Sequence, residues 1–333
     1  MTTTDPRSNP PDWPTDFDIL DPAYVANPAG VWADLRKRCP IAHSDRYGST
    51  WLPTRYDDLV EEFVDAGRAD AAQDYAQHIP VRVIATMLGV PLEDEDIFTG
   101  WAVTILQQGF HDIQRSADAI LEVINYFKDK LDSRQDVPES ERPDDLITLL
   151  VEARQDGDPL DDRHRIGSCF LLLLAGIDTT WSSIGASLYH LASHPADQAR
   201  LRTEPELVTT AIEELLRFYS PVTMARYVAE DTEYAGCPMK KGDKVLMSFP
   251  AGNRDPEHFD RPDEFVIDRQ RNRHFAFGSG IHRCLGSNLA RMELRVAIEC
   301  FLDRIPKFEL SDPAEVTWSG GQVRGPRSVP VCW

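Results

Sequence analysis

The spacing of apolar residues along the chain predicts a protein that is mostly helical. Apolar positions recur at intervals of three and four, the period of a helix with one buried face. In the first half of the chain this period occupies four segments: residues 71–88, 93–108, 113–131 and 144–153. Before them, residues 1–30 are an irregular lead-in rich in proline, 31–39 a short helical pattern and 40–55 short extended pieces around a Tyr-Gly turn.

The strongest periodic pattern lies in the middle of the chain. From Ile166 to Leu191 the apolar residues step by 4, 4, 3, 4, 3, 4 and 3, with Asp161 and Asp162 before them and a His-Pro stop at 194–195. At 1.5 Å per residue such a helix would be roughly 50 Å long. Because it is apolar nearly all round its middle, we expect it to run through the protein rather than over its surface.

The second half of the chain mixes helices with short strands. A helix is expected over residues 206–219, a strand-and-turn region over 227–249, a meander rich in proline and acids over 253–268, a helix over 287–302 and a hairpin-like tail over 316–333. The chain is therefore predicted to be mainly α with a β minority.

Composition narrows the class of protein. The 333 residues include 35 basic and 55 acidic side chains, a net charge of −20, with 42% hydrophobic residues, as in soluble globular proteins. The acidic balance excludes a nucleic-acid partner or a basic membrane-surface protein. The longest apolar run, residues 169–177, is too short to span a bilayer, and the N-terminus has no signal pattern. We therefore expect no membrane association and a cytoplasmic location.

The cysteines give no metal or disulfide framework. There are six, at positions 39, 169, 237, 284, 300 and 332, and no two of them form a CxxC pair. This spacing offers no zinc site, no iron–sulfur cluster and no pattern of disulfides. The chain also lacks a GxSxG or HExxH motif, a phosphate loop and a dinucleotide glycine fingerprint, so it carries no recognisable nicotinamide or flavin domain.

Two features in helical segments break the local rules. The sequence AGIDTT, residues 175–180, lies at the centre of the long helix, where glycine costs roughly 1 kcal/mol relative to alanine. Asp178 falls on the apolar face, where an unpaired carboxylate is expensive. One threonine bonding back to a helix carbonyl would be ordinary, but this combination is harder to explain by packing. In EELLR, Glu214 and Arg217 have the spacing of a common helix ion pair, which alone identifies nothing.

A third feature is a loop, FGSGIHRCLG, residues 277–286, directly before the last helix. Its glycines permit a tight turn that approaches another group closely. Cys284 lies at the mouth of the helix, where amide donors and the positive helix end would stabilise a thiolate. A lone cysteine is usually a small hydrophobe, but the glycines, His282 and Arg283 argue against that here. The pattern leaves two alternatives open, a nucleophile with His282 as its base or a metal ligand.

Together, the three features resemble the cytochrome P-450 family of haem-thiolate monooxygenases, specifically the soluble bacterial type. FGSGIHRCLG matches the family's cysteine loop, AGIDTT its oxygen-activation motif and EELLR its Glu-x-x-Arg helix. The order and separation fit, and the resemblance extends from about residue 71 to the C-terminus, with a further match in 22–59. It implies the cytochrome P-450 fold, mainly α with a minor β portion, as a single haem-binding domain over residues 1–333. In that fold the long central helix lies over the haem and the cysteine loop precedes a C-terminal helix.

The resemblance also implies an activity and its partners. It implies a monooxygenase that activates O2 and inserts one oxygen atom into an apolar small-molecule substrate. Electrons would come from a separate protein of the ferredoxin or flavodoxin type. A peroxide-using variant is a weaker alternative, because Asp178 and Thr179 favour oxygen activation.

Roles for individual residues follow from the same resemblance. Cys284 would be the axial thiolate on the iron of heme b (iron protoporphyrin IX), and thiolate ligation favours O–O cleavage. Asp178 and Thr179 would be catalytic and deliver protons, while Glu214 and Arg217 would be structural and tie their helix to the meander. The implied cofactor-binding residues are Ala175, Gly176, Arg226, Phe277, Gly278, His282, Cys284 and Gly286. Among these, Arg226 and His282 would bind propionates, and Ala175 and Gly176 would leave room for oxygen.

The sequence departs from the family's pattern in two places. Many relatives place an Arg directly before Phe265 to complete the Glu–Arg network, and here that position is Glu264. Near Val60–Glu61, several tens of residues found in relatives are missing, including a substrate-contacting loop and a helix on the proximal side of the haem. This motivates the alternative of a truncated member that binds haem weakly or not at all and lacks monooxygenase turnover.

Overall fold

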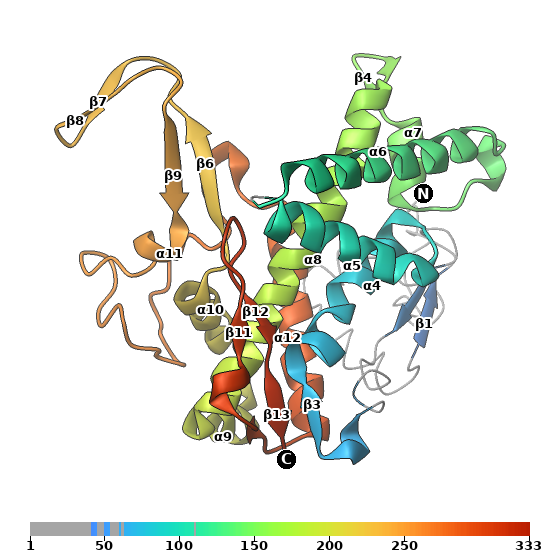
Figure 1. Cartoon of the computed structure of the whole chain (residues 1–333). Helices are drawn as coiled ribbons and strands as arrows, with labels where there is room; N and C mark the ends of the chain where they lie inside the picture. Colours follow the sequence, from blue (N-terminus) through green and yellow to red (C-terminus); the bar gives the residue numbers. More distant parts are fainter. Residues whose placement is uncertain (1–40, 45–49, 54–59, 61–62, 110) are drawn as a thin grey trace, which may run out of the picture.

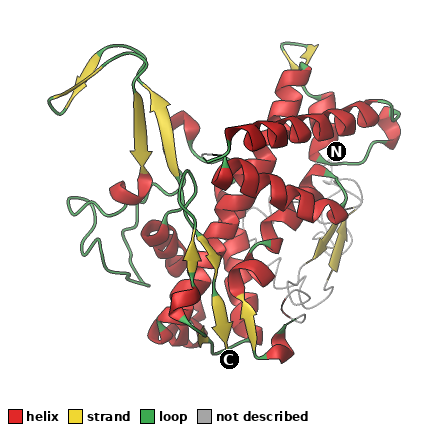
Figure 2. Ribbon diagram, in the orientation of Figure 1, coloured by secondary structure: helices red, strands yellow, loops and turns green. Residues whose placement is uncertain are grey.

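The computed structural model describes residues 41–44, 50–53, 60, 63–109 and 111–333. The predicted lead-in at 1–30 and the helical pattern at 31–39 lie outside these residues. Helices dominate the described chain, and the strands are short and lie mostly at its edges (Figure 2). Within the described parts of residues 40–55, the expected extended pieces are confirmed as β1 (Ile41–Ser44) and β2 (Thr50–Pro53), which pair antiparallel.

The helices before the centre of the chain agree with the predicted segments. The apolar period over 71–88 becomes two helices separated by one residue, and the period over 93–108 becomes three consecutive helical segments of different pitch. The elements are η1 (Val64–Ala66), η2 (Ala71–Ala76), α4 (His78–Leu88), η3 (Leu92–Asp94), α5 (Glu95–Val103), η4 (Thr104–Gln108), α6 (Ile113–Gln135), η5 (Glu139–Glu141) and α7 (Leu146–Glu152). Of these, η2 and η4 are single π-helical stretches.

The predicted long helix is confirmed as α8 (Asp162–Ser193), which runs through the middle of the molecule (Figure 1). The side chain of Asp161 caps its first turn by accepting a hydrogen bond from the His164 amide at 2.8 Å. An 18-residue window of α8 is apolar enough to cross a membrane, and 61% of that window is buried inside the protein. Its apolar character is therefore accounted for by the core.

The helices after α8 include one that the sequence pattern did not predict. The His-Pro stop ends α8 as expected, but a new short helix begins at its proline, a residue favoured in a first helical turn. The elements are α9 (Pro195–Thr203), η6 (Pro205–Leu207), α10 (Val208–Tyr219), α11 (Phe249–Gly252), η7 (Gly280–His282), α12 (Ser287–Arg304) and η8 (Pro313–Glu315). The predicted helices at 206–219 and 287–302 correspond to α10 and α12.

Six small antiparallel sheets complete the described fold. The longest pair is β6 (Thr223–Tyr227) with β9 (Lys244–Ser248), which forms an arm tipped by β7 (Thr232–Tyr234) and β8 (Cys237–Met239) (Figure 1). The C-terminal tail forms the expected hairpin and a three-stranded sheet. The remaining strands are β3 (Arg68–Asp70), β4 (Arg154–Gln155), β5 (Asp158–Pro159), β10 (Glu309–Leu310), β11 (Thr317–Trp318), β12 (Pro326–Ser328) and β13 (Pro330–Cys332).

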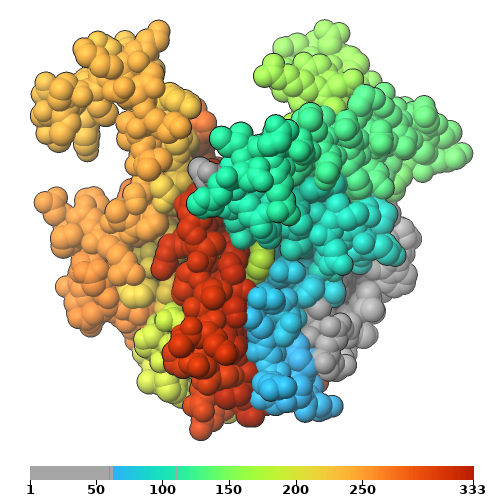
Figure 3. All heavy atoms as spheres, in the orientation of Figure 1, coloured from blue at the N-terminus to red at the C-terminus, as the bar shows by residue number. Residues whose placement is uncertain are grey.

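The core consists of two apolar clusters that share α8. One is formed by the C-terminal half of α8 with η2, α10, α12 and the last strands, and the other by the N-terminal half with α4, α5, α6 and α7. The pairing of β13 with β3 brings the C-terminus beside residues 68–70, and the space-filling view shows the two segments in contact (Figure 3). The last strands are thereby held against α8, which matters for the site described next.

Candidate functional site

The loop before α12 holds Cys284 in a tight turn. The Cys284 amide donates a 2.9 Å hydrogen bond to the carbonyl of Phe277, closing the loop on itself. Gly278 and Gly280 have φ of +67° and +65°, left-handed conformations that favour glycine. A Cβ at Gly286 would lie 4.0 Å from the Cys284 sulfur, so the backbone passes directly beside that atom.

The electrostatics of the Cys284 thiol differ from the sequence-based expectation. The helix end and nearby cations were expected to favour the thiolate. In the structure, desolvation by the surrounding loop raises the pKa of the thiol, although a hydrogen bond from the Gly286 amide and the charges of Arg291 and Arg283 oppose it. A thiol that coordinates a metal ion is deprotonated by the metal. Without a bound metal, the Cys284 side chain is therefore a neutral thiol. The Gly286 amide is already placed to donate a hydrogen bond to the thiolate that metal coordination would produce.

The surface beside Cys284 is apolar and open. Ile281 and Leu285, on either side of the cysteine in sequence, are 97% and 94% exposed. In β9, Leu246 and Met247 are also exposed, at 65% and 42%. The ring of Phe249, directly after β9, lies 3.7 Å from the place of a Cβ at Gly278, so the end of this strand adjoins the loop. Large exposed apolar side chains around one thiol are typical of a site for an apolar ligand.

The two predicted propionate-binding residues, Arg226 and His282, are both exposed. Arg226 is exposed in β6 and donates at 2.8 Å to the carbonyl of Ala225, and His282 is exposed in η7. A soft thiol ligand, an apolar surface and two exposed basic side chains form a donor set that fits haem, whose ring is apolar and whose propionates are anionic. In the described chain no three His, Cys, Asp or Glu side chains gather as an alternative metal site.

Phe277 anchors the loop to the body of the protein. It packs against the larger apolar cluster, and the Arg291 guanidinium lies 4.5 Å from the centre of its ring. Glu213 in α10 binds Arg291 through both oxygens, at 2.6 and 3.0 Å. Burial acts to raise the pKa of the Glu213 carboxyl, but hydrogen bonds from His274 and Arg291 and the charge of Arg291 hold it at about 2. The loop is therefore tied to α10 through an ionised pair.

The centre of α8 presents an open stripe. Gly167, Leu171 and Ala175, four residues apart, are exposed in a helix that is otherwise largely buried. Thr179 follows on the same face, and its hydroxyl donates to the Ala175 carbonyl at 2.7 Å. Gly176 faces the other way, because a Cβ there would lie 2.5 Å from Ile84 of α4. The glycine therefore has a packing role, in addition to the oxygen-binding role that stays a prediction.

Asp178 is completely buried and carries an ion pair that sequence reasoning missed. Its Oδ1 accepts from Arg327 in β12 at 2.8 Å and from Gln107 in η4 at 3.2 Å. Burial raises the pKa of Asp178, while Arg327 and Gln107 act to lower it. No sequence signal links these positions, since each partner comes from a distant segment of the chain.

Glu214 and Arg217 form a fully buried pair with two hydrogen bonds of 2.8 Å. Arg217 also donates to the carbonyls of Asn253, Pro262 and Glu264 in the meander. These bonds join α10 to the meander, and the structural role of the pair stays a prediction. The i, i+3 spacing alone was uninformative, because the same motif on a helix surface would be an ordinary ion pair. What distinguishes this pair is its burial, which the sequence does not show.

The third member of this network is Arg269 rather than a residue at position 264. Arg269 donates from Nε to Glu214 Oε2 at 2.9 Å, and Asn272 donates to the same oxygen at 3.1 Å. Glu264 contributes only its backbone carbonyl and keeps its side chain on Arg261. The departure noted in the sequence is thus compensated five residues later.

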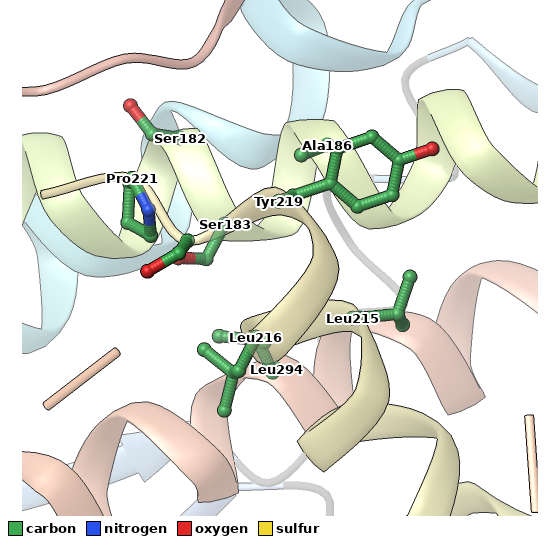
Figure 4. Close-up of a pocket in the computed structure, with 9 residues that line it drawn as sticks. Ser182, Ser183, Ala186, Leu215, Leu216, Tyr219, Pro221 and Leu294 are labelled. Atoms are coloured by element: carbon green, nitrogen blue, oxygen red, sulfur yellow. The ribbon is translucent and has the colours of Figure 1, made fainter. Parts of the chain in front are cut away.

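A small cavity lies between α8, α10 and α12 (Figure 4). It has room for about one water molecule and is far too small for an organic substrate. Its lining residues are Ser182, Ser183, Ala186, Leu215, Leu216, Tyr219, Ser220, Pro221 and Leu294. This cavity is therefore not a substrate site, and the candidate site residues are those of the cysteine loop and the exposed stripe of α8.

The candidate site thus combines one cysteine in a glycine-rich loop with an acid–alcohol pair in the middle of a long core helix. The cytochrome P450 family model matches residues 94–317, more than half of the chain, and the chain belongs to the cytochrome P450 family. Haem as cofactor, O2, an organic substrate and a redox partner follow from membership of this family. The predicted fold class is confirmed.

Curated relatives support the same class of enzyme. Mycinamicin IV hydroxylase/epoxidase of Micromonospora griseorubida is 33% identical over 342 residues, covering 100% of this chain and 83% of that protein. Nocardicin C N-oxygenase of Nocardia uniformis subsp. tsuyamanensis is 38% identical, covering 90% and 76%. With hydroxylases and monooxygenases among its relatives, the chain is an oxidoreductase of the monooxygenase type.

Solved structures agree with the fold. The cytochrome P450 PksS of the bacillaene polyketide synthase from Bacillus subtilis 168 has a TM-score of 0.74 and 28% identity, covering 94% of this chain and 98% of that chain. Substrate-free CYP109E1 from Bacillus megaterium has a TM-score of 0.75 and 33% identity, covering 83% and 73%. Curated relatives are covered over 65 to 83% of their length, so they contain residues without a counterpart here. The shortening near Val60–Glu61 stays a prediction.

Proposed function

We propose that this chain is a haem-thiolate monooxygenase that inserts one atom of O2 into an apolar organic substrate. Electrons would come from a separate protein of the ferredoxin or flavodoxin type. The observation that carries the proposal is the cysteine loop: an accessible Cys284 with an amide donor on its sulfur and exposed apolar side chains on both sides. We further propose one haem-binding domain and a cytoplasmic location, since the apolar α8 is accounted for by the core.

The cofactor proposed is heme b, held by Cys284 through its iron. The chain contains no CxxC sequence and so no site for covalent haem attachment of the c type. When bound, the haem supplies the iron at which O2 is reduced, and its thiolate ligand favours cleavage of the O–O bond. Gly278 and Gly286 would give the loop its close approach, and Arg226 and His282 would donate hydrogen bonds to the propionates.

The residues of α8 are proposed to handle protons. The Thr179 hydroxyl donates its hydrogen to the Ala175 carbonyl, which leaves its oxygen lone pairs free to accept a hydrogen bond from a donor such as water. Asp178, the next residue toward the N-terminus, holds a carboxylate in the interior where it can take up and release a proton. Ala175 is small and exposed, which leaves room beside the hydroxyl.

Haem incorporation tests the proposal. The protein is expressed with a haem supply, and bound haem per chain is measured for wild type, Cys284→Ala and Cys237→Ala. Cys237 is an exposed thiol in β8 and serves as the matched control. We expect about one haem per chain in wild type and control, and a large loss in Cys284→Ala, because one thiolate is the axial ligand. Wild type purified without haem would favour the alternative of a truncated member without turnover.

A further inference from the structure

The ion pair behind Thr179 joins two distant parts of the chain. Asp178 lies in α8, and Arg327 enters from β12, near the C-terminus. Both hydrogen bonds to the carboxylate, from Arg327 and from Gln107, end on Oδ1. Oδ2 is buried and has no partner among the described residues. One oxygen is therefore committed to holding the carboxylate in place, and the other is free to exchange a proton.

Two glycines let the segment that carries Arg327 pack directly on α8, beside Asp178. A Cβ at Gly325 would lie 2.3 Å from the Cβ of Ser182 and 2.7 Å from its Cα, so only a glycine lets this segment lie directly on α8. From the helix side, a Cβ at Gly185 would lie 3.1 Å from Pro326. Arg327 follows immediately, and it also donates to the Ser182 hydroxyl at 3.2 Å. The packing of β12 on α8 therefore fixes the position of Arg327.

The surroundings make Arg327 the electrostatic partner of the carboxylate. A buried carboxylate without a counter-charge takes up a proton and becomes neutral. Within the described chain, the groups that act on Asp178 are Arg327 from β12 and the uncharged Gln107 from η4. Burial also lowers the pKa of Arg327, and Asp178 opposes that shift. Each charge therefore depends on the other, and Arg327 lies over the Trp181 ring with 15% of its side chain exposed.

We propose that Arg327 is the positioning residue of Asp178, so that the C-terminal strand β12 is a working part of the proton relay. The inference rests on the proposed function. Arg327 touches neither substrate nor cofactor; it acts by fixing the carboxylate of Asp178 behind Thr179 and by favouring its charged form. Undocking of β12 would disable the relay and leave the cysteine loop unchanged.

The test compares three single variants of the full chain. Arg327→Gln removes the charge, Arg327→Lys keeps it, and Arg324→Gln is the matched control, since Arg324 lies on the same segment over Trp318, away from Asp178. The titration of Asp178 is followed by NMR of 13C-labelled aspartate, with Asp178→Asn to assign the signal. We expect the midpoint in Arg327→Gln to rise by about one pH unit or more, a tenfold change in proton affinity. Lysine and the control should stay near wild type.

An unchanged midpoint in Arg327→Gln would overturn the proposal. The titration does not require bound haem, so it decides the role of Arg327 even if wild type carries none and the proposed function fails. In protein that binds haem, Arg327→Gln should keep its haem content and lose product per reducing equivalent by about tenfold, the lost reductant appearing as peroxide. Full coupling in a variant with a shifted midpoint would also count against the relay.

A double variant keeps the test informative if Arg327→Gln folds poorly. Asp178→Asn with Arg327→Gln removes the buried carboxylate at position 178 together with its counter-charge, so restored folding of the double variant is the expected result. In urea unfolding, the stability lost in the double variant should then be smaller than the sum of the losses in the two single variants. Additive losses would show that the two side chains act independently and would overturn the proposal.

Discussion

Glu293, in the helix that follows the cysteine loop, allows a quantitative prediction for stability. Its side chain is buried in α12, and its Oε2 has no hydrogen-bond partner in the described chain. Desolvation raises the pKa of this carboxyl to about 8. The unfolded chain binds fewer protons than the folded protein between the two pKa values, so stability falls as pH rises through this range. Replacement by Gln removes that dependence.

The magnitude follows from the difference between the two pKa values. The carboxyl titrates near 4.5 when unfolded and near 8 when folded. Each pH unit between them removes about 1.4 kcal/mol from the free energy of unfolding. From pH 5 to pH 8, the stability of Glu293→Gln relative to wild type should therefore rise by about 3 to 4 kcal/mol. Any constant effect of the amide on packing cancels in this difference.

Urea unfolding at pH 5, 6, 7 and 8 measures the prediction. Glu299→Gln is the control, because Glu299 lies on the same helix, is partly exposed and pairs with Arg295 at 3.2 Å. Its stability relative to wild type should vary by less than about 0.5 kcal/mol over this range. A Glu293→Gln difference that is flat with pH would refute the reasoning, since it would mean that Glu293 is ionised in the folded protein.

Three further predictions concern the site and its supports. Thr179→Ala should retain haem but release peroxide instead of product, as measured by peroxide yield per reducing equivalent; normal coupling would remove the hydroxyl from the relay. Gly325→Ala should lower the free energy of urea unfolding by about 1–3 kcal/mol, because the new methyl overlaps Ser182; an unchanged midpoint would show that β12 can shift freely. Glu214→Gln should cost about 3–5 kcal/mol, since it leaves buried arginines without their carboxylate. The exposed Glu264→Gln, its control, should change stability by under about 0.5 kcal/mol, and equal losses would contradict the burial argument.

Much of the helical framework could be predicted because its signals are local. The apolar period and the flanking cap and stop residues define α8 to within a residue or two, since both act within a few turns of one helix. The cysteine loop, its glycines and its position directly before α12 could also be recognised from the sequence. By contrast, α9 is a short helix without a clear apolar stripe, and nothing in its sequence beyond Pro195 signals it.

The partners of the buried charges could not be predicted because they are set by long-range packing. Arg269 reaches Glu214 from 55 residues away, and Arg327 reaches Asp178 from the far end of the chain. Neither arginine belongs to a local sequence motif that would mark its partner. The one local clue is Gly325, whose missing side chain lets β12 contact α8, but a lone glycine in a loop has many explanations.

The CO-difference spectrum of the reduced, purified protein tests the central claim most directly. Ligation of iron by the Cys284 thiolate predicts a red-shifted Soret band in wild type and in the Cys237→Ala control. The band should be lost in Cys284→Ala, which lacks the sulfur ligand. A wild-type protein that carries haem but shows no such band, or a Cys284→Ala variant that keeps it, would contradict the assignment of this chain's active site.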